Sequence, residues 1–303
     1  VNALRLVGSK EQQARYLPPM VEGRWTGTMN LTEPQAGSDL ALVRTRAVPE
    51  GDHYRLHGQK IFITYGDHDL TDQIIHLVLA RTPDAPAGTK GISIFIVPKF
   101  KMDDAGNIGE RNGVTTVSLE EKMGIHGSPT AVLAYEDSIG YLIGEENKGM
   151  RIMFNMMNSA RLSVGVQGLA VAERAYQDAL AYAKERKQGR MPGADEDQTI
   201  INFPDVRRML LTQKAYIAAL RRITLLNAAY IDEMTHSPDE AVRARAAEME
   251  ALLTPISKAF GSDLGNELTS LAMQVFGGMG YIEETGVAQY YRDVRIAAIY
   301  EGT

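Results

Sequence analysis

Residues 131–157, AVLAYEDSIGYLIGEENKGMRIMFNMM, contain the point at which the chain changes from one kind of secondary structure to another. Before Gly144 the apolar residues come in short runs separated by turns, which is typical of β-strands. After Gly149 the apolar residues recur every three or four positions, which is the period of an α-helix. The sequence therefore predicts a β domain followed by a helical domain, an α+β multidomain protein.

The β-type pattern extends backwards from this point to Trp25. At least seven short strand-like runs occur there, without a helical period between them, and predict an antiparallel β-barrel or sandwich of roughly 120 residues. Lys10 to Arg24 resembles the end of a helix, which Pro18-Pro19 should stop or kink. We therefore expect a helical segment over residues 1–24 and a middle β domain over residues 25–144.

The helical pattern extends forwards from Gly149 to the end of the chain. It predicts long helices over Met150–Lys187, Asp205–Met234 and Asp239–Phe276, and a shorter one over Gly286–Arg295. Pro204 suits a first helical turn, and Pro255 predicts a kink. Long amphipathic helices with short connections favour an antiparallel bundle over residues 145–303. Because the chain starts at Val1 and ends just after an apolar run, we expect both ends to be truncations of a longer protein.

Composition excludes several classes of site. The 303 residues include no cysteine, which excludes disulfides, thiolate nucleophiles and Cys-ligated metals, and fits a cytoplasmic protein. Lys+Arg is 32 against 38 Asp+Glu, a net charge of −6, which argues against a nucleic-acid partner. No apolar run approaches the length of a membrane span, and no signal peptide is visible, so no membrane segment is predicted.

Five motifs resemble those of the acyl-CoA dehydrogenase family. Residues 31–39, LTEPQAGSD, are similar to its TEPxAGSD signature, and residues 60–64, KIFIT, to its flavin-binding strand. The others are Arg161 followed by residues 185–188 (ERKQ), residues 274–281 (QVFGGMGY) and residues 299–303 (IYEGT). The separations of Arg161 from Arg186 and of Gln274 from Glu301 match the family. Residues 66–80 and 188–190 look most like the 3-methylmercaptopropionyl-CoA dehydrogenase subgroup.

The resemblance implies a fold, a cofactor and partners. The family has an N-terminal helical domain, which is mostly absent here, a middle β domain and a C-terminal four-helix bundle. It implies FAD as cofactor and α,β-dehydrogenation of an acyl-CoA thioester to the trans-2-enoyl-CoA. The substrate would be 3-methylmercaptopropionyl-CoA or a short- to medium-chain acyl-CoA, and the electron acceptor an electron-transferring flavoprotein. It also implies a homodimer or homotetramer.

This reaction needs a base for the α-proton, a hydride acceptor at Cβ and hydrogen-bond donors to the thioester oxygen. No side chain accepts hydride, so flavin N5 would be the acceptor. Glu301 is the candidate base, because it follows the apolar run 296–300 and burial would raise the pKa of its carboxyl towards neutrality. The alternative is a solvated glutamate at the start of a helix.

The remaining site residues are implied by the resemblance. Cofactor contacts would be Leu31, Thr32, Ser38, Phe62, Ile63, Thr64, Arg186, Gln188, Gln274, Gly277, Gly278 and Thr303. In the family, the group that holds the pyrophosphate and adenosine of FAD comes from a neighbouring subunit, and here it would be Arg186, Gln274, Gly277 and Gly278. Substrate contacts would be Ser38, Asn158, Arg161, Tyr300 and Gly302. Ordinary alternatives remain open: strand threonines for Thr32 and Thr64, a core aromatic for Phe62 and a structural ion pair for Arg161.

Three further alternatives are open at this point. The acid and histidine cluster formed by Asp67, His68, Asp69, Asp72 and His76 suits a polar turn better than a metal site, so no metal is predicted. The same fold could carry an acyl-CoA oxidase, which reduces oxygen, or a non-catalytic, DNA-associated relative. The acidic charge balance disfavours the last of these. Because family segments are missing, we expect this fragment alone to bind FAD weakly.

Overall fold

The computed structural model describes residues 1–103 and 105–302, and these residues divide into two compact units. Unit 1 comprises residues 1–122 and 126–156, and unit 2 comprises residues 123–125 and the chain from residue 157 onward. The division into domains at residues 24/25 and 144/145 stays a prediction. Each unit has its own hydrophobic core, so each holds its part of the predicted site by its own packing.

Two short helices begin unit 1, α1 (Asn2–Val7) and α2 (Lys10–Val21). Ser9 and Gln12 form a capping box at the start of α2, which satisfies the first free backbone N–H groups. Pro18-Pro19, expected to stop or kink the helix, do not end it at once: both lie in its last turn, and α2 ends two residues later at Val21. Prolines cannot donate there, but the Pro18 carbonyl still accepts from the Glu22 N–H and the Pro19 side chain is buried.

A seven-stranded sheet forms the body of unit 1, in the order β1-β4-β5-β9-β3-β2, with β8 paired to β9. Strands β6 and β7 make a separate hairpin. The prediction of an antiparallel domain is confirmed except for one pair: β1 and β4 run parallel, so the sheet is mixed. The strands are β1 (Trp25–Asn30), β2 (Arg46–Glu50), β3 (His53–Thr64), β4 (Gln73–Ala80), β5 (Ser93–Pro98), β6 (Phe100–Met102), β7 (Ile108–Arg111), β8 (Val114–Leu119) and β9 (Thr130–Leu142).

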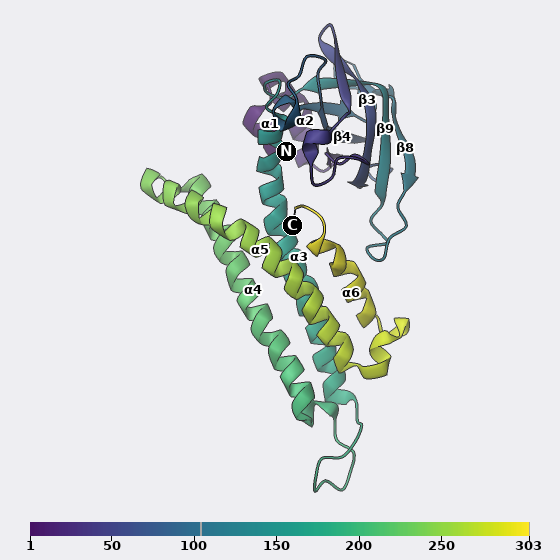
Figure 1. The fold of residues 1–303 in the computed structure, drawn as a ribbon, viewed down its shortest axis with the longest axis vertical. Coiled ribbons are helices and arrows are strands. Elements are labelled where there is room, and N and C mark those ends of the chain that lie inside the picture. Colours follow the sequence, from purple (N-terminus) through teal and green to yellow (C-terminus); the bar gives the residue numbers. More distant parts are fainter. Residues whose placement is uncertain (104, 303) are drawn as a thin grey trace. The chain divides into compact units, whose positions relative to one another are not determined.

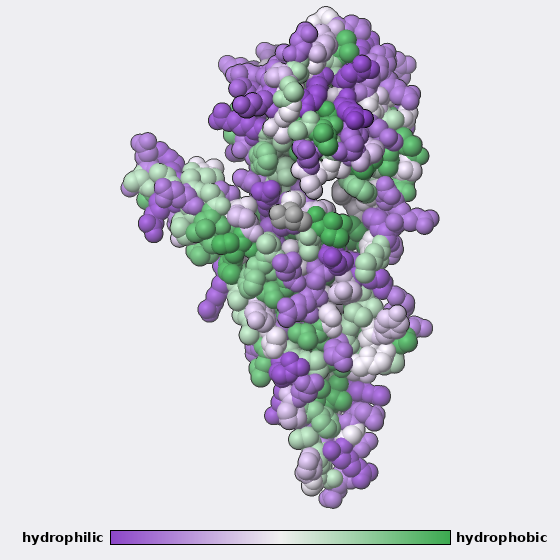
Figure 2. Space-filling model, in the orientation of Figure 1, coloured by the Kyte–Doolittle hydropathy of each residue, from purple (hydrophilic) through white to green (hydrophobic). Residues whose placement is uncertain are grey.

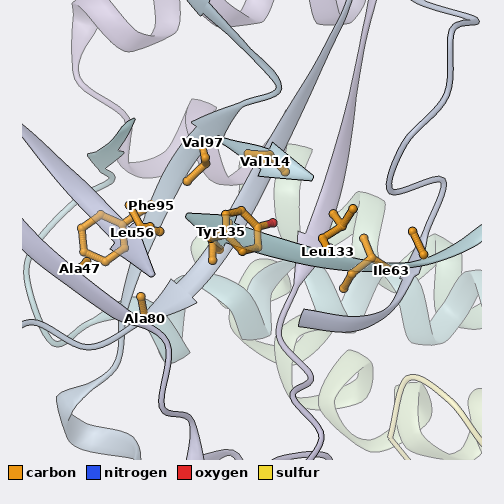
Figure 3. Packing of buried hydrophobic residues seen from close by; sticks show 11 residues of the cluster. Ala47, Leu56, Ile63, Ala80, Phe95, Val97, Val114, Leu133 and Tyr135 are labelled. Carbon is orange, nitrogen blue, oxygen red and sulfur yellow. The ribbon is translucent and has the colours of Figure 1, made fainter. Parts of the chain in front are cut away.

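The inner face of this sheet holds the core of unit 1 (Figure 3). Leu56 and Ile63 come from β3, Phe95 from β5, and Leu133 and Tyr135 from β9, and all of these side chains are buried. Every residue of β4 and β5 is buried, so both faces of these two strands are covered. The predicted flavin motifs lie in β3 and just after β1, and this packed core holds both strands in place.

The predicted bundle of four helices is confirmed (Figure 1). Its helices are α3 (Gly149–Glu185), α4 (Pro204–His236), α5 (Glu240–Val275) and α6 (Val287–Val294), and the beginning of α3 belongs to unit 1. Pro204 stands in the first turn of α4, as predicted. A short 3₁₀ helix, η6 (Arg295–Ala298), follows α6 and leads to Glu301.

Helices α3 and α5 cross closely at glycines. A Cβ on Gly165 would collide with the Ser257 carbonyl, and one on Gly168 with the Gly261 carbonyl. The two backbones can approach this far only because those side chains are missing. This crossing fixes the position of the α5 residue that follows Ser257, Lys258, relative to Arg161, one turn before Gly165.

The surface of unit 2 keeps large apolar side chains among polar ones (Figure 2). Leu211 and Leu225 on α4 are 65% and 63% exposed, and Leu252 on α5 is 56% exposed. In the part of the chain that the structure describes, no helix is long and apolar enough to cross a membrane.

Candidate active site

A β-bulge in β3, the predicted flavin strand, directs the Phe62 side chain outwards. Leu56 and Lys60 point inwards and Lys60 lies opposite Leu133, but the register then shifts so that Ile63 lies opposite Ala131. Phe62 within the bulge has a φ of +60° and a side chain that is 60% exposed. Strand alternation alone would have directed Phe62 towards the core with Leu56 and Lys60. A bulge and a left-handed non-glycine residue together are typical of a functional position.

The loop after β1 lies against this bulge within unit 1. The Ile61 N–H donates to the Thr32 carbonyl at 2.9 Å, so the segments containing Thr32 and Phe62 are neighbours. Thr32 and Leu31 are half-buried, whereas Thr64 is exposed. Among the described residues, neither threonine hydroxyl has a hydrogen-bond partner, so both are available to a ligand. Ser38 is also exposed, in the turn before the short helix η1 (Leu40–Leu42).

Ile63 differs from the other predicted cofactor residues of unit 1. Its side chain is 2% exposed and belongs to the core cluster, beside Leu133 in Figure 3. The side chain therefore anchors the strand, and only the backbone of Ile63 is left as a contact for a cofactor.

A buried ion pair joins the loop to the bulge. Lys60 Nζ lies 2.7 Å from Glu33 Oε1 and donates to the Leu31 carbonyl at 3.0 Å. Glu33 also accepts from the Thr45 hydroxyl at 2.6 Å and from the Arg44 N–H at 2.8 Å. Burial alone would raise the pKa of Glu33, but these partners, Lys60 foremost, hold it below its usual value. Burial lowers the pKa of Lys60 to about 8, against the opposing charge of Glu33.

In unit 2, Glu301 occupies a strained turn after η6. Its φ is +59° and that of Gly302 is +79°, so both residues are left-handed. Arg161 Nε on α3 donates to the Glu301 carbonyl at 3.3 Å, and a Cβ on Gly302 would come within 2.8 Å of Arg161 Nη2. A non-glycine residue in this conformation costs free energy, which the surrounding contacts must offset.

The environment of Glu301 raises the pKa of its carboxyl. Burial is the main cause, and the positive charges of Lys258 and then Arg161 oppose it. Among the described residues, no cation lies within 4.0 Å of this carboxylate. Lys258 is itself only 3% exposed, and burial lowers the pKa of its ammonium, with Asp263 and Glu301 opposing this. A half-buried carboxylate that lacks a direct ion pair is suited to accept a proton.

The neighbours of Glu301 fix this turn to the bundle. The Tyr300 hydroxyl donates to Gln167 Oε1 on α3 at 2.5 Å, and Val294 and Ala297 pack with Val164 in a small core cluster. Asn158 lies on α3 three residues before Arg161, on the same face of the helix, and both are partly buried. Unit 2 therefore brings together every predicted substrate residue except Ser38, which belongs to unit 1.

A second group of predicted cofactor residues lies where α3 and α5 end. Tyr182 and Phe276 stack with ring centroids 4.2 Å apart, which joins these two helix ends. Four residues predicted to hold the pyrophosphate and adenosine of FAD are exposed near this stack, as is the predicted cofactor contact Gln188: Arg186, Gln274, Gly277 and Gly278. Gly277 has a φ of +61° and, like Gly278, has open space where a Cβ would be. Thr303 lies outside the described residues.

The cluster of acids and histidines after β3 is engaged in other interactions. Asp67 pairs with Lys99 and with Arg111, each at 2.6 Å, and His76 is buried with its Nδ1 2.7 Å from the Thr28 hydroxyl. Within residues 1–103 and 105–302, no three His, Asp or Glu side chains are grouped as a metal site would require.

Comparison with known proteins identifies this arrangement. Residues 28–138 match the middle domain of the acyl-CoA dehydrogenases, and residues 147–303 match their C-terminal domain. The chain belongs to the acyl-CoA dehydrogenase family. It is 54% identical to the 3-methylmercaptopropionyl-CoA dehydrogenase of Ruegeria pomeroyi, over all of this chain and 52% of that protein. The chain spans about half the length of the first curated relatives it matches.

Solved acyl-CoA dehydrogenase structures share the fold. The butyryl-CoA dehydrogenase of Megasphaera elsdenii superposes with a TM-score of 0.82 at 33% identity, over all of this chain and 71% of that one. An acyl-CoA dehydrogenase of Bacillus anthracis complexed with FAD superposes with a TM-score of 0.82 at 30% identity, over 99% of this chain and 49% of that one. The predicted family is therefore confirmed.

The sequence analysis did not name two lysines near the predicted site residues, Lys60 and Lys258. Lys60 could have been found, because it shares the strand parity of Leu56 and a lysine facing a core requires a buried acid. Lys258 carries a weaker signal, a charged residue on a helix face that contains Gly261 and Gly265. Its proximity to Glu301 depends on the helix crossing.

Proposed function

We propose that this chain supplies the flavin-binding and base-bearing parts of an FAD-dependent acyl-CoA dehydrogenase. The enzyme would convert an acyl-CoA thioester to the trans-2-enoyl-CoA. The observation that carries the proposal is Glu301: a half-buried carboxylate in a strained turn, without a direct ion pair among the described residues, with a pKa raised by burial. These are the properties that a base for a weakly acidic carbon needs.

Glu301 would take the proton from Cα of the thioester, and the electron pair left there would form the new double bond. Its own N–H would donate to the thioester oxygen, where negative charge develops. The hydrogen bond from Arg161 to the Glu301 carbonyl supports this role, because it restrains the residue that carries both the carboxylate and the N–H. Bound FAD would supply the chemistry that side chains lack, by accepting the hydride that leaves Cβ.

The residues of this chain fit FAD. In unit 1, exposed Phe62 offers an aromatic face, and the hydroxyls of Thr32 and Thr64, which have no partner among the described residues, offer neutral hydrogen bonds to a heterocycle. At the ends of α3 and α5, Arg186 and the exposed backbone of Gly277 and Gly278 suit a pyrophosphate. The resemblance assigns the latter group to the FAD of a neighbouring subunit, so we propose that the protein is a homo-oligomer. Light scattering would measure the mass of the oligomer.

The identity to the Ruegeria pomeroyi relative supports 3-methylmercaptopropionyl-CoA as the substrate, with butyryl-CoA as the alternative. The test is the visible spectrum of the purified protein during anaerobic addition of each thioester. We expect the flavin band to bleach, faster with 3-methylmercaptopropionyl-CoA. Acetyl-CoA is the control, because it has no Cβ to lose hydride. A flavin that stays oxidised with both substrates would contradict the proposal.

We also propose an electron-transferring flavoprotein as the electron acceptor. After anaerobic reduction, reoxidation by such a flavoprotein should be much faster than reoxidation by oxygen. The reverse order would make the protein an oxidase.

A further inference from the structure

We propose that Lys60 and Glu33 are positioning residues for the flavin: their buried ion pair locks the loop carrying Thr32 to the bulge carrying Phe62. The inference rests on the proposed function, because it assumes that flavin lies against these two segments. Neither residue need touch the cofactor. Their role would be to hold the residues that do.

The contacts of Lys60 reach both sides of the junction. Lys60 lies in β3 immediately before the bulge, and its ammonium binds the Leu31 carbonyl and the Glu33 carboxylate in the loop after β1. Beside this ion pair, the Ile61 N–H donates to the Thr32 carbonyl. Thr32 is therefore flanked on both sides, at Leu31 and at Glu33, by residues held by one ammonium group.

Glu33 extends this lock to a third segment. Its two carboxylate oxygens accept from Thr45 and Arg44, just before β2, as well as from Lys60. Both members of the pair are almost fully buried, at 0% and 3% side-chain exposure. A buried pair with its hydrogen bonds satisfied has one geometry, so it holds the loop in one position rather than in several.

The bulge explains why such a lock is useful. Phe62 is exposed in a left-handed conformation that a regular strand would not adopt, and Ile63 resumes the inward direction. A strained segment persists only where its surroundings determine it. The ion pair secures the residue before the bulge, the core secures Ile63 after it, and Phe62 and Thr32 are presented together.

The test compares three holoenzymes: wild type, Lys60→Met/Glu33→Gln and Asn112→Ala. The double variant removes both charges at once, so no buried charge is left unpaired, and glutamine can still accept from Thr45. Asn112 is the matched control, because it is 1% exposed and its amide bonds the Pro98 and Ile139 carbonyls, away from both flavin segments. The measurements are the dissociation constant for FAD, the reduction potential of the bound flavin and the melting temperature of the apoprotein.

We expect the double variant to bind FAD about tenfold more weakly, the loss that removing an outer support typically causes at metal sites, and to show a shifted potential. Asn112→Ala should melt earlier yet keep the wild-type FAD affinity and potential. A double variant with unchanged affinity and potential would overturn the inference while leaving the proposed function intact. A wild-type protein that takes up no flavin would instead remove the proposed function, and the inference with it.

Discussion

Two glutamates of this chain stand in opposite electrostatic situations. Glu33 in unit 1 is almost fully buried, paired with Lys60 at 2.7 Å, and has a lowered pKa. Glu301 in unit 2 is half-buried, has no cation within 4.0 Å among the described residues, and has a raised pKa. Burial raises the proton affinity of both carboxylates, and only Glu33 has partners close enough to reverse the effect.

The difference separates a structural carboxylate from a reactive one. The lone pairs of Glu33 are used by hydrogen bonds, so the side chain cannot take a proton without breaking the lock. Those of Glu301 remain available, and its two cationic neighbours, Lys258 and Arg161, act from a distance. Mutation should therefore have different consequences at the two sites. At Glu301 it should mainly reduce activity, and at the ion pair of Glu33 it should mainly reduce stability.

The largest effect is expected at Glu301. Glu301→Gln keeps the size of the side chain but removes the base, so turnover should fall by about 10²–10⁴-fold with flavin content unchanged. Single-turnover bleaching of the flavin under anaerobic conditions measures this. Glu284→Gln is the control, an exposed glutamate in the short helix η5 (Glu283–Thr285). Wild-type rates in Glu301→Gln would assign the base to another residue.

The second effect concerns the stability of unit 1. Lys60→Met alone leaves the Glu33 carboxylate buried without its cation and should lower the unfolding free energy by about 3–5 kcal/mol. Adding Glu33→Gln should restore most of that loss, because the unpaired charge disappears. Urea unfolding of the apoproteins measures both changes. Equal stabilities of the single and double variants would show that charge burial is not the cause.

The third effect is a gain in stability in Glu301→Gln. A carboxyl whose folded pKa is raised stabilises the fold below its unfolded pKa, near 4.3, and loses that contribution as the pH rises through the folded pKa. At pH 8 the ionised form of Glu301 therefore destabilises the fold, and replacing it with glutamine should raise the melting temperature. The gain should vanish near pH 4. A pH-independent gain would point to relief of backbone strain instead.

The smallest effect is a shift in the pH dependence of turnover. Lys258 lowers the pKa of Glu301, so Lys258→Met should raise that pKa. Because the base acts in its ionised form, the acidic limb of the kcat/KM profile should move to higher pH. Lys214→Met, an exposed lysine on α4, should leave the profile in place. A shift of equal size in both variants would mean that only net charge matters.

Much of the fold could be predicted because periodicity is a local signal. The three long helical patterns and the shorter fourth one coincide with α3 to α6 within a few residues, and the strand patterns with most of the sheet. The structure differs from the expected one at two places where packing opposes local preference. Pro18-Pro19 continue α2 for one turn, and β1 pairs in parallel with β4, a relation between strands separated by more than forty residues.

The motifs predicted which residues form the site, but not their backbone conformation, exposure or charge environment. Phe62 is named by the KIFIT motif, but its exposure depends on a register shift against β9 that no local pattern shows. Glu301 follows an apolar run, but its left-handed φ and its distant cations come from the packing of η6 on α3 and α5. Charge environments are set by segments that meet only after folding.

The glycine crossing of α3 and α5 determines how far apart the cations Arg161 and Lys258 lie. Arg161 lies one turn before Gly165, and Lys258 follows the Ser257 carbonyl against which Gly165 packs. A side chain at this contact would push the two helices apart and so move both positive charges relative to the Glu301 carboxylate. A larger residue at the crossing should therefore change the pKa of Glu301 without touching a reacting atom. Substitutions at this contact would be a way to shift the pH range in which the enzyme is active.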